Sequence, residues 1–402
     1  MAKNLRKIEQ KTLFLLLVLT NFFVGGMVGL ERTVLPLIAE AEFGLSSAFF
    51  GVSFIATFGL SKAITNFFAG RLADKYGRKI ILIIGWLLAI PIPFILISSD
   101  SWLSILFANV LLGVQQSLTW SMTVVMKVDI VKPNQRGFAI GLNEFAGYSG
   151  LSFIAYLTGV IASHTAYRPE PFYVGFVLIL LGILCSFFSK ETRPKQFSTT
   201  SYRLSQVFML TSWKHKTMHA ISLAGLFTNF KDGMLWGLLP LLLAERQFSL
   251  NHISLIVFLY PIVWSISQLK FGPLSDRVGR RKIILYGLFL QSISLFLFSE
   301  VEHLYSAIIA AVLVGLGTGM VYPTLIAFIS DCANANIRAG ALGIYRFWRD
   351  LGYAVGALSS GYSASLIGIE RTLTVVGFVF LAVTLYSVIK MKENLVETKH
   401  VY

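Results

Sequence analysis

Long apolar segments recur along the whole chain, separated by shorter polar stretches that carry most of the charge. A membrane-spanning helix needs about 20 mostly apolar residues, and a run of that kind predicts a transmembrane helix. Twelve segments fit this description: 12–38, 47–69, 80–99, 102–126, 137–162, 171–189, 217–243, 252–271, 283–299, 304–329, 339–362 and 370–389. The pattern therefore predicts an all-α integral membrane protein with twelve transmembrane helices.

The composition agrees with a membrane protein. Of the 402 residues, 55% are hydrophobic and only 13% are charged, against about 25% charged residues in a soluble domain. The first apolar run follows four basic residues but is too long for a signal peptide and lacks a small-residue cleavage site, so we expect a retained helix. Cys185 and Cys332 both fall in or near predicted spans, which argues against a disulfide framework.

The net charge of +14 is explained by where the basic residues lie. If the N-terminus is cytoplasmic, segments on the inner side hold 26 of the 34 lysines and arginines, while outer loops hold Arg168, Arg246 and Arg371. This bias is the positive-inside pattern, and it predicts a plasma (inner) membrane protein with both termini in the cytoplasm. The basic excess therefore indicates topology, with attraction to the headgroups of the lipid bilayer as a by-product, and not nucleic-acid binding.

An internal repeat divides the chain near its middle. Residues 70–79 read "GRLADKYGRK" and residues 272–281 read "GPLSDRVGRR", 202 positions later. At the same offset Asp129 and Arg136 recur as Asp331 and Arg338. The repeat predicts two pseudo-symmetric six-helix bundles, 1–189 and 217–402, joined by a polar cytoplasmic linker at 190–216.

The two copies of the loop sequence resemble the G-x-L-a-D-r-x-G-r-k motif of the major facilitator superfamily (MFS). The resemblance covers essentially the whole chain, with each copy between the second and third helices of its half. It implies two bundles related by an axis along the membrane normal, around a central site that opens alternately to each side. It also implies that helices one, five, seven and eleven line the cavity.

The same resemblance assigns a role to the loop motif. It implies that Asp74 docks near Arg338 at the start of the eleventh helix, and by the repeat that Asp276 docks near Arg136 at the start of the fifth. Such contacts would latch the cytoplasmic side when the outside is open. Glycine permits the tight turn and the basic residues keep the loops inside. The full latch set is Asp74, Gly77, Arg78, Asp276, Gly279, Arg280, Arg136 and Arg338. The alternative is that these loops serve topology and folding only.

Charged residues inside the predicted spans are the candidate site. Arg346, Arg349, Asp350 and Tyr353 have helical spacing that places them on one face of the eleventh helix. A charge at a helix centre costs about 2.5–3.5 kcal/mol on insertion scales, so these groups should face a cavity or a partner. They could also neutralise one another within the helix.

The repeat pairs Arg346 with Glu144 on the fifth helix, and we expect the two side chains to meet around one water-accessible cavity. Glu144 is the preferred proton site because its own helix offers no basic partner within a turn. The other intramembrane charges are Lys231 and Asp232 in the seventh helix and Glu31 and Arg32 in the first. The first pair could be a static ion pair, and the second could snorkel to the outer interface.

One more charge and two departures from the family pattern complete the set. Lys62, in the second helix, is expected to reach the cytoplasmic side or a carboxylate and to have no substrate role. The fourth helix has Asn109 where proton-coupled members often carry a buried arginine, and the fifth lacks the Gly-Pro motif of drug/proton antiporters. Both departures weaken a drug-efflux assignment.

The resulting prediction is a secondary active transporter of a small organic solute, proton-coupled, with export favoured. Two alternatives stay open: a pH-insensitive anion exchanger or uniporter centred on Arg346 and Arg349, and a non-transporting sensor or assembly component on a transporter scaffold. The sequence has no nucleotide-binding loop and no Cys/His metal spacing, so we expect neither an enzyme nor a cofactor, and a monomer as the functional unit.

Overall fold

The computed structural model describes residues 2–45, 48–132, 136–193, 204–333 and 337–393, and the regular structure there is helical throughout. The N-terminal half (N-half) comprises α1 (Ala2–Arg32), α2 (Leu35–Ala41), α3 (Ala48–Gly51), α4 (Ser53–Tyr76), α5 (Arg78–Ala89), α6 (Pro91–Ser98), α7 (Trp102–Ile130), α8 (Arg136–His164) and α9 (Glu170–Phe188). Part of the expected linker is also helical, as α10 (Leu204–Met209) and the π-helical turn η2 (Leu210–Lys214). The C-terminal half (C-half) comprises α11 (Lys216–Glu245), α12 (Leu250–Val278), α13 (Arg280–Ser299), α14 (Leu304–Cys332), α15 (Arg338–Ile367) and α16 (Ile369–Lys390).

The transmembrane helices fall into two groups by composition. Nine helical segments of the described residues are long and apolar enough to cross a membrane by themselves. The other three long helices, α4, α11 and α15, span 24, 30 and 30 residues and are the ones that carry Lys62, the Lys231–Asp232 pair and the Arg346–Asp350 stretch. These charged residues lower the hydropathy of the three helices. The cost of placing them in the membrane is reduced because each one faces protein rather than lipid.

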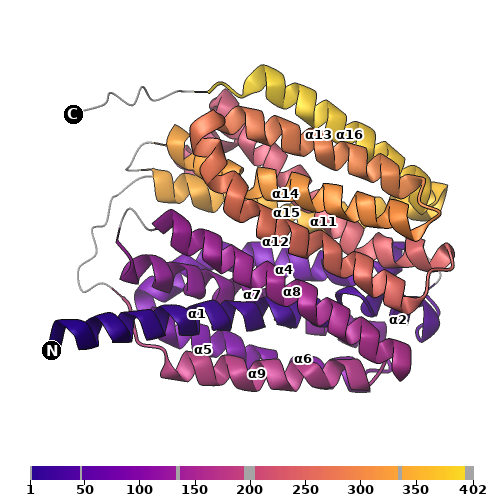
Figure 1. Ribbon diagram of the computed structural model, residues 1–402, viewed down its shortest axis with the longest axis horizontal. Coiled ribbons are helices and arrows are strands. Elements are labelled where there is room, and N and C mark those ends of the chain that lie inside the picture. The colour runs from indigo at the N-terminus through magenta and orange to yellow at the C-terminus, as the bar shows by residue number, and fades with distance from the viewer. Residues whose placement is uncertain (1, 46–47, 133–135, 194–203, 334–336, 394–402) are drawn as a thin grey trace.

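The two halves lie side by side with their helices along the long axis of the molecule (Figure 1). α1 begins and α16 ends at the same end of the bundle, which we call the inner end; the opposite end is the outer end. The halves meet where α4 packs against α15 and where α8 packs against α12. The architecture is the predicted pair of six-helix bundles.

Small residues allow the backbones of the two halves to approach closely. A Cβ atom placed at Gly59 in α4 would lie 2.6 Å from the Cβ of Tyr353 and 2.8 Å from the backbone nitrogen of Ala354 in α15. Farther along the interface, the hydroxyls of Ser149 and Ser265 are 2.9 Å apart. Helix association in lipid is driven by packing and by hydrogen bonds between helices. Small side chains at these positions allow both kinds of contact across the interface.

The two halves are in contact at the outer end and leave space beside α8 and α15 near the inner end. At the outer end the Ser163 hydroxyl donates to Asn251 Oδ1 across the two halves at 2.7 Å, and a Cβ at Gly159 would lie 1.9 Å from Ser254 Oγ. Near the inner end, a Cβ at Gly141 in α8 or at Gly343 in α15 would meet nothing within 4 Å. These two glycines occupy equivalent positions of the repeat.

Candidate functional site

A small cavity of about 30 Å³ lies between the halves, midway along the bundle. This volume is about the share of one water molecule in the liquid. Its walls come from α4, α7 and α8 of the N-half and from α14 and α15 of the C-half. The fifth and eleventh spans, α8 and α15, thus line it as expected, whereas the first and seventh, α1 and α11, contribute none of its described lining residues. The lining residues are Lys62, Asn66, Gln116, Trp120, Ser121, Val124, Ile140, Glu144, Tyr148, Tyr322, Ile326, Arg346 and Arg349. Glu144 and Arg346, which were expected around one cavity, thus both line this one together with Arg349, and we call it the central cavity.

Glu144 is held by neutral donors. Its Oε1 accepts a hydrogen bond from Trp120 Nε1 at 2.8 Å and one from Asn143 Nδ2 at 3.3 Å. In the part of the chain that the structure describes, no cation forms an ion pair with this carboxylate. Glu144 therefore contributes a cavity-facing acid that no ion pair neutralises.

Asp350 is engaged by partners from both halves. Nη2 and Nε of Arg349 donate to its Oδ1 at 2.7 and 2.9 Å. Asn66 of α4 donates to its Oδ2 at 2.7 Å, across the interface. The Arg349–Asp350 contact is the intrahelical pairing that the sequence left open. It neutralises Asp350 within the bundle while Arg349 still lines the central cavity.

Lys62 was expected to reach the cytoplasmic side or to pair with a carboxylate, and among the described residues it does neither. The side chain is 9% exposed and lines the central cavity. Its ammonium group lies 5.0 Å from the centre of the Tyr353 ring and 5.6 Å from that of Phe58, at cation–π distance. An unmatched lysine in a span is the signal that could have placed it there, since the cost of a lipid-exposed charge already demands an interior position.

Lys231 and Asp232 form a separate cluster inside the C-half. Their side chains are fully buried and pair at 2.6 Å. Lys231 also donates to the Tyr260 hydroxyl at 2.6 Å and to Thr318 Oγ1 at 2.7 Å, and the Tyr260 hydroxyl donates to Asp232. Neither charged residue belongs to the lining of the central cavity. The arrangement is that of a static ion pair which joins α11 to α12 and α14.

Glu31 and Arg32 are buried, so the snorkelling alternative is wrong for this pair. Their side chains are 1% and 0% exposed and approach to 3.4 Å. The Arg32 guanidinium lies 4.8 Å from the Phe58 ring and 4.7 Å from the Trp236 ring. Because Trp236 belongs to the C-half, Arg32 is part of the contact that closes the outer end above the central cavity. Trp236 in turn stacks on Tyr353 at 5.0 Å.

Charge and aromatic rings together define what the central cavity can bind. Lys62, Arg346 and Arg349 contribute positive charge to the lining, and Glu144 contributes the negative charge. Tyr148 and Tyr322, from opposite halves, face each other edge to face at 5.9 Å. In this arrangement the cavity has room for about one water molecule. Once a movement of the halves widens it, such a lining suits a solute that combines a carboxylate or similar anion with a flat apolar body.

The motif loops at the inner end repeat their contacts in both halves. Gly77 and Gly279 adopt φ values of +99° and +101°, which glycine tolerates without strain. Arg78 pairs with Asp129 at 3.4 Å, and Arg280 pairs with Asp331 at 3.1 Å. Each loop is thus fixed to the fourth helix of its own half.

The expected latch is only partly visible. The side chains of Asp74 and Arg136 lie outside the described residues. Asp276 pairs with Arg280 of its own loop, and Arg338 Nε donates to the Ser330 carbonyl at 3.1 Å within the C-half. In this arrangement the described latch residues have partners in their own half.

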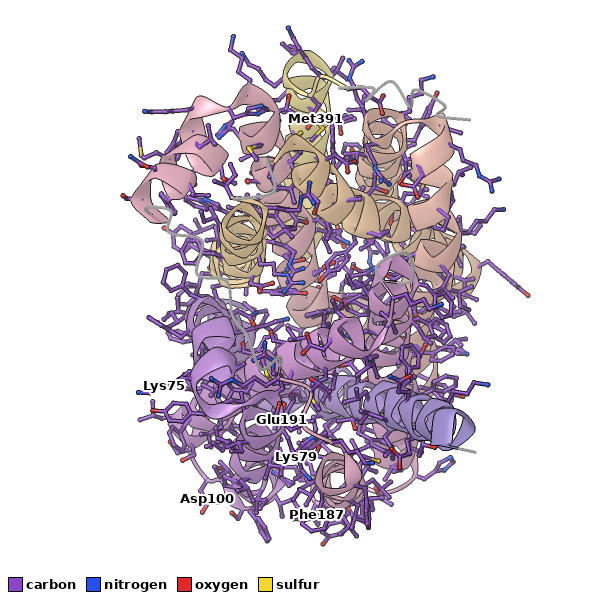
Figure 2. The ribbon with its side chains drawn as sticks, turned by 90° about the vertical axis from the view of Figure 1, so that its left-hand side faces the viewer. Lys75, Lys79, Asp100, Phe187, Glu191 and Met391 are labelled. Carbon is purple, nitrogen blue, oxygen red and sulfur yellow. The ribbon has the colours of Figure 1, made fainter. Side chains whose placement is uncertain are left out.

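A glutamate that the sequence analysis missed caps the third helix of each half. Glu191 follows α9, and its carboxylate accepts from the backbone N–H groups of Arg78 and Lys79 at 3.1 Å each. Glu393 lies 202 positions later and accepts from the Arg281 N–H at 3.4 Å. Figure 2, which looks onto the inner end, shows Lys79 between Glu191 and Phe187. The offset of the repeat was the signal that could have identified the pair.

The environment of Glu191 has two opposing effects on its pKa. Partial burial raises the pKa of the carboxyl group, but hydrogen bonds from backbone N–H groups lower it further than burial raises it. The net pKa lies below the usual value of a glutamate. The charged form is therefore the one that holds the start of α5 against the end of α9.

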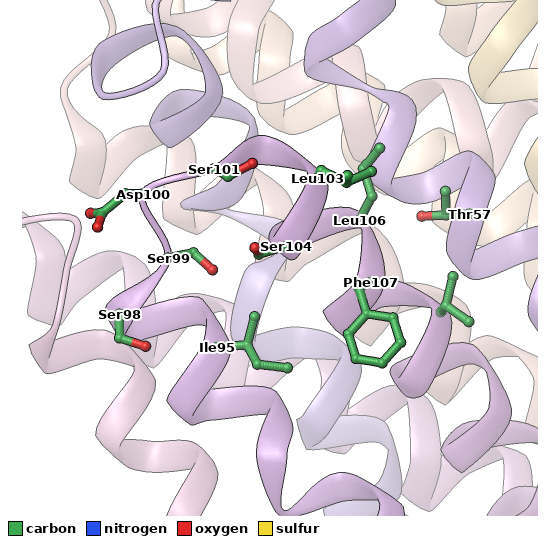
Figure 3. Close-up of a pocket in the computed structure, with 11 residues that line it drawn as sticks. Thr57, Ile95, Ser98, Ser99, Asp100, Ser101, Leu103, Ser104, Leu106 and Phe107 are labelled. Atoms are coloured by element: carbon green, nitrogen blue, oxygen red, sulfur yellow. The ribbon is translucent and has the colours of Figure 1, made fainter.

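A larger hollow lies away from these groups, on the flank of the N-half near the outer end (Figure 3). It has a volume of about 1080 Å³, and its walls come from α4, α6, α7 and the loop with Ser99, Asp100 and Ser101. None of the predicted site residues lines it. Among the residues with described positions, no group of three or more His, Cys, Asp or Glu side chains could hold a metal ion.

Proteins of similar sequence include two bacterial multidrug resistance proteins named MdtG. The chain is 24% identical over 377 residues to the multidrug resistance protein MdtG of Salmonella arizonae, covering 91% of this chain and 92% of that protein. The MdtG protein of Citrobacter koseri is likewise 24% identical, with 91% of each chain covered.

Solved structures with the same fold include two transporters. The nucleoside transporter NupG aligns with a TM-score of 0.76 at 12% identity, covering 94% of this chain and 99% of NupG. The human organic anion transporter MFSD10 (TETRAN) aligns with a TM-score of 0.72 at 16% identity, covering 94% and 99%. The sequence model of the Major Facilitator Superfamily matches residues 17–218 and 221–400. The chain therefore belongs to the Major Facilitator Superfamily of membrane transporters.

Proposed function

We propose that this transporter exports a small organic solute in exchange for protons, by alternating access, and that a monomer suffices. The inner end, which carries the basic loops, is assigned to the cytoplasmic face of the plasma (inner) membrane, with both termini on that side. The MdtG relatives are named multidrug resistance proteins, which supports export. Both walls of the central cavity come from one chain, which supports a monomer as the working unit.

The proposal rests on the contrast between Glu144 and the other intramembrane acids. Glu31, Asp232 and Asp350 each pair with a cation, so adding a proton would leave that cation buried without its partner. Breaking a buried pair in this way is strongly unfavourable, by about 3–5 kcal/mol. Glu144 shares the central cavity with cations, but its hydrogen bonds come from the neutral side chains of Trp120 and Asn143, so gaining or losing a proton breaks no buried ion pair.

Proton exchange at Glu144 gives a route to coupling. When the inner end is open, a deprotonated Glu144, the cations Lys62 and Arg346 and the Arg349–Asp350 ion pair leave the central cavity with net positive charge, which attracts an anionic or zwitterionic solute. When the outer end opens, protonation of Glu144 removes its negative charge and changes its hydrogen bonds to Trp120 and Asn143. In that arrangement the latch contacts of Asp74 with Arg338 and of Asp276 with Arg136 would close the inner end.

A second function is favoured by the excess of cations over acids in the lining. In anion exchange without protons, Arg346 and Arg349 would bind the solute, and Glu144 would neither gain nor lose a proton during transport. The two functions differ in one measurable quantity, the proton flux that accompanies the solute.

The experiment is solute-driven proton movement in proteoliposomes that contain the full chain, a pH-sensitive dye and an imposed pH gradient. A panel of aromatic carboxylates, zwitterions and organic cations serves as the probe. We expect proton movement with at least one anionic or zwitterionic member, and its loss in Glu144→Gln, with solute exchange retained. Glu42→Gln is the control, because Glu42 is an acid at the outer end that pairs with Arg168 away from the central cavity. Proton flux unchanged in Glu144→Gln would rule out this residue as the proton site.

A further inference from the structure

A third hollow, which is apolar, lies at the interface of the halves, on the side away from the central cavity. Its volume is about 640 Å³, and we call it the linker groove. Its lining comes from α4 of the N-half, from α10 of the linker and from α15 of the C-half. The lining residues are Ile64, Phe67, Phe68, Ser205, Phe208, Met209, Ile344 and Phe347. All of them except Ser205 are apolar.

Helical spacing separates the linker groove from the central cavity. On α4, Lys62 and Asn66 face the cavity, while Ile64, Phe67 and Phe68 face the groove. Between the two hollows, α4 and α15 are joined by the hydrogen bond from Asn66 to Asp350. The groove therefore opens outward from the bundle, toward the bilayer, and Ser205 is the one polar side chain among its lining residues, too few to hold a hydrophilic solute.

The exposed apolar side chains in the linker groove need a hydrocarbon neighbour. Ile64 is 50% exposed, Phe68 is 47% exposed and Met209 is 44% exposed. Trp213 in η2 is 56% exposed, as expected of an aromatic side chain at the membrane–water interface. The linker segment is held in place because Trp348 of α15 donates to the Ser212 hydroxyl at 2.9 Å.

Basic residues lie on the inner side of this groove. Lys75 follows Phe68 by seven residues, so it lies on the same face of α4, about 10 Å closer to the inner end. The groove-lining helix α10 is followed by η2, which ends at Lys214, and then by α11, which begins at Lys216. All three lysines are exposed. Lysines at this depth favour acidic headgroups over zwitterionic ones.

We propose that the linker groove binds an acyl chain of an anionic phospholipid of the inner leaflet, with the headgroup beside Lys75, Lys214 and Lys216. The orientation of the protein in this proposal is that of the proposed function. Since the walls come from both halves and the linker, the groove has this shape only in this arrangement of the halves. A lipid that fills it stabilises the inner-open state and so regulates transport.

The test uses the full chain in phosphatidylcholine vesicles that contain a phosphatidylglycerol with a photoactivatable group on its acyl chain. Peptide mapping after illumination should place most of the label on the segments 64–68, 205–209 and 344–347. Ser205→Trp, which fills the groove from an exposed position, should reduce that label to the level of other lipid-facing segments. Ser359→Trp, at an exposed position of α15 in its outer part, should not.

Lipid preference and conformation supply independent readouts. Lys75→Gln combined with Lys214→Gln should abolish the preference for phosphatidylglycerol over a phosphatidylcholine probe of the same chain. In the single-cysteine variant Ser254→Cys, phosphatidylglycerol should slow alkylation from the outside, and Ser205→Trp should remove this effect. Label spread evenly over the lipid-facing helices, or label that a transported solute displaces, would overturn the proposal. Neither measurement depends on proton coupling, so the lipid proposal can fail while the function of Glu144 stands.

Discussion

Replacing Gly59 by alanine should shift the protein away from the outer-closed arrangement. The added Cβ would lie 2.6 Å from the Cβ of Tyr353 and 2.8 Å from the backbone nitrogen of Ala354, both in the other half. Backbone atoms cannot rotate aside, so the halves must separate at this contact. Overpacking of this kind costs about 1–3 kcal/mol. A bias of that size changes the ratio of outer-open to outer-closed molecules by roughly 5–150-fold.

The assay is the rate at which a buried cysteine reacts with a membrane-impermeant maleimide added from the outside. Ser254→Cys is the reporter, because Ser254 is 0% exposed and packs against Gly159 in the closed outer end. Cys185 and Cys332, both free cysteines, are replaced by serine in every variant. When the outer-open state is the minor one, the alkylation rate is proportional to its population. Gly59→Ala should therefore raise the rate by the factor given above.

Gly141→Ala is the matched control. It makes the same chemical change inside a helix, but its Cβ would meet nothing within 4 Å. The rate in this variant should stay close to that of the parent. Equal rates in Gly59→Ala and Gly141→Ala would show that the close approach of α4 and α15 does not hold the outer end closed, and the assignment of the conformational state would then be wrong.

Two further predictions concern the carboxylates of Glu191 and Asp350. The pKa of Glu191 is lowered. The stabilisation that its capping gives to α5 is therefore complete above the usual glutamate pKa and is lost as the pH falls through the lowered value. Glu191→Gln should reproduce that loss at neutral pH. The measurement is hydrogen exchange at the Arg78 and Lys79 amides, normalised to intrinsic rates, and exchange no faster in the variant would contradict the cap. Arg349→Leu leaves the Asp350 carboxylate buried and should cost about 3–5 kcal/mol, with most of it recovered in Arg349→Leu combined with Asp350→Leu. Thermal unfolding in detergent measures the stability of the two variants. An equal loss of stability in both would show that the unpaired Asp350 carboxylate is not the cause of the destabilisation.

Local sequence determined the helices and their order. Most spans are continuous apolar runs, and a chain in lipid must satisfy its own backbone hydrogen bonds, so such a run has essentially one available structure. The 202-residue offset likewise identified the two halves, and helical spacing put Arg346, Arg349 and Asp350 on one face. These properties depend only on residues close in the chain, or on the comparison of one stretch with another.

Tertiary structure decided which charges meet. Lys62 and Glu144 line the same cavity only because α4 and α8 are packed at a particular rotation and depth, and Lys231 is withdrawn from it because Tyr260 and Thr318 approach from α12 and α14. Rotation and depth are fixed by close packing along whole helices, such as that at Gly59, and no local pattern encodes them. The sequence alone therefore identified most of the charged residues that have to be inside, Lys62 being the exception, whereas the partner of each one was determined by the packing of helices distant in the chain.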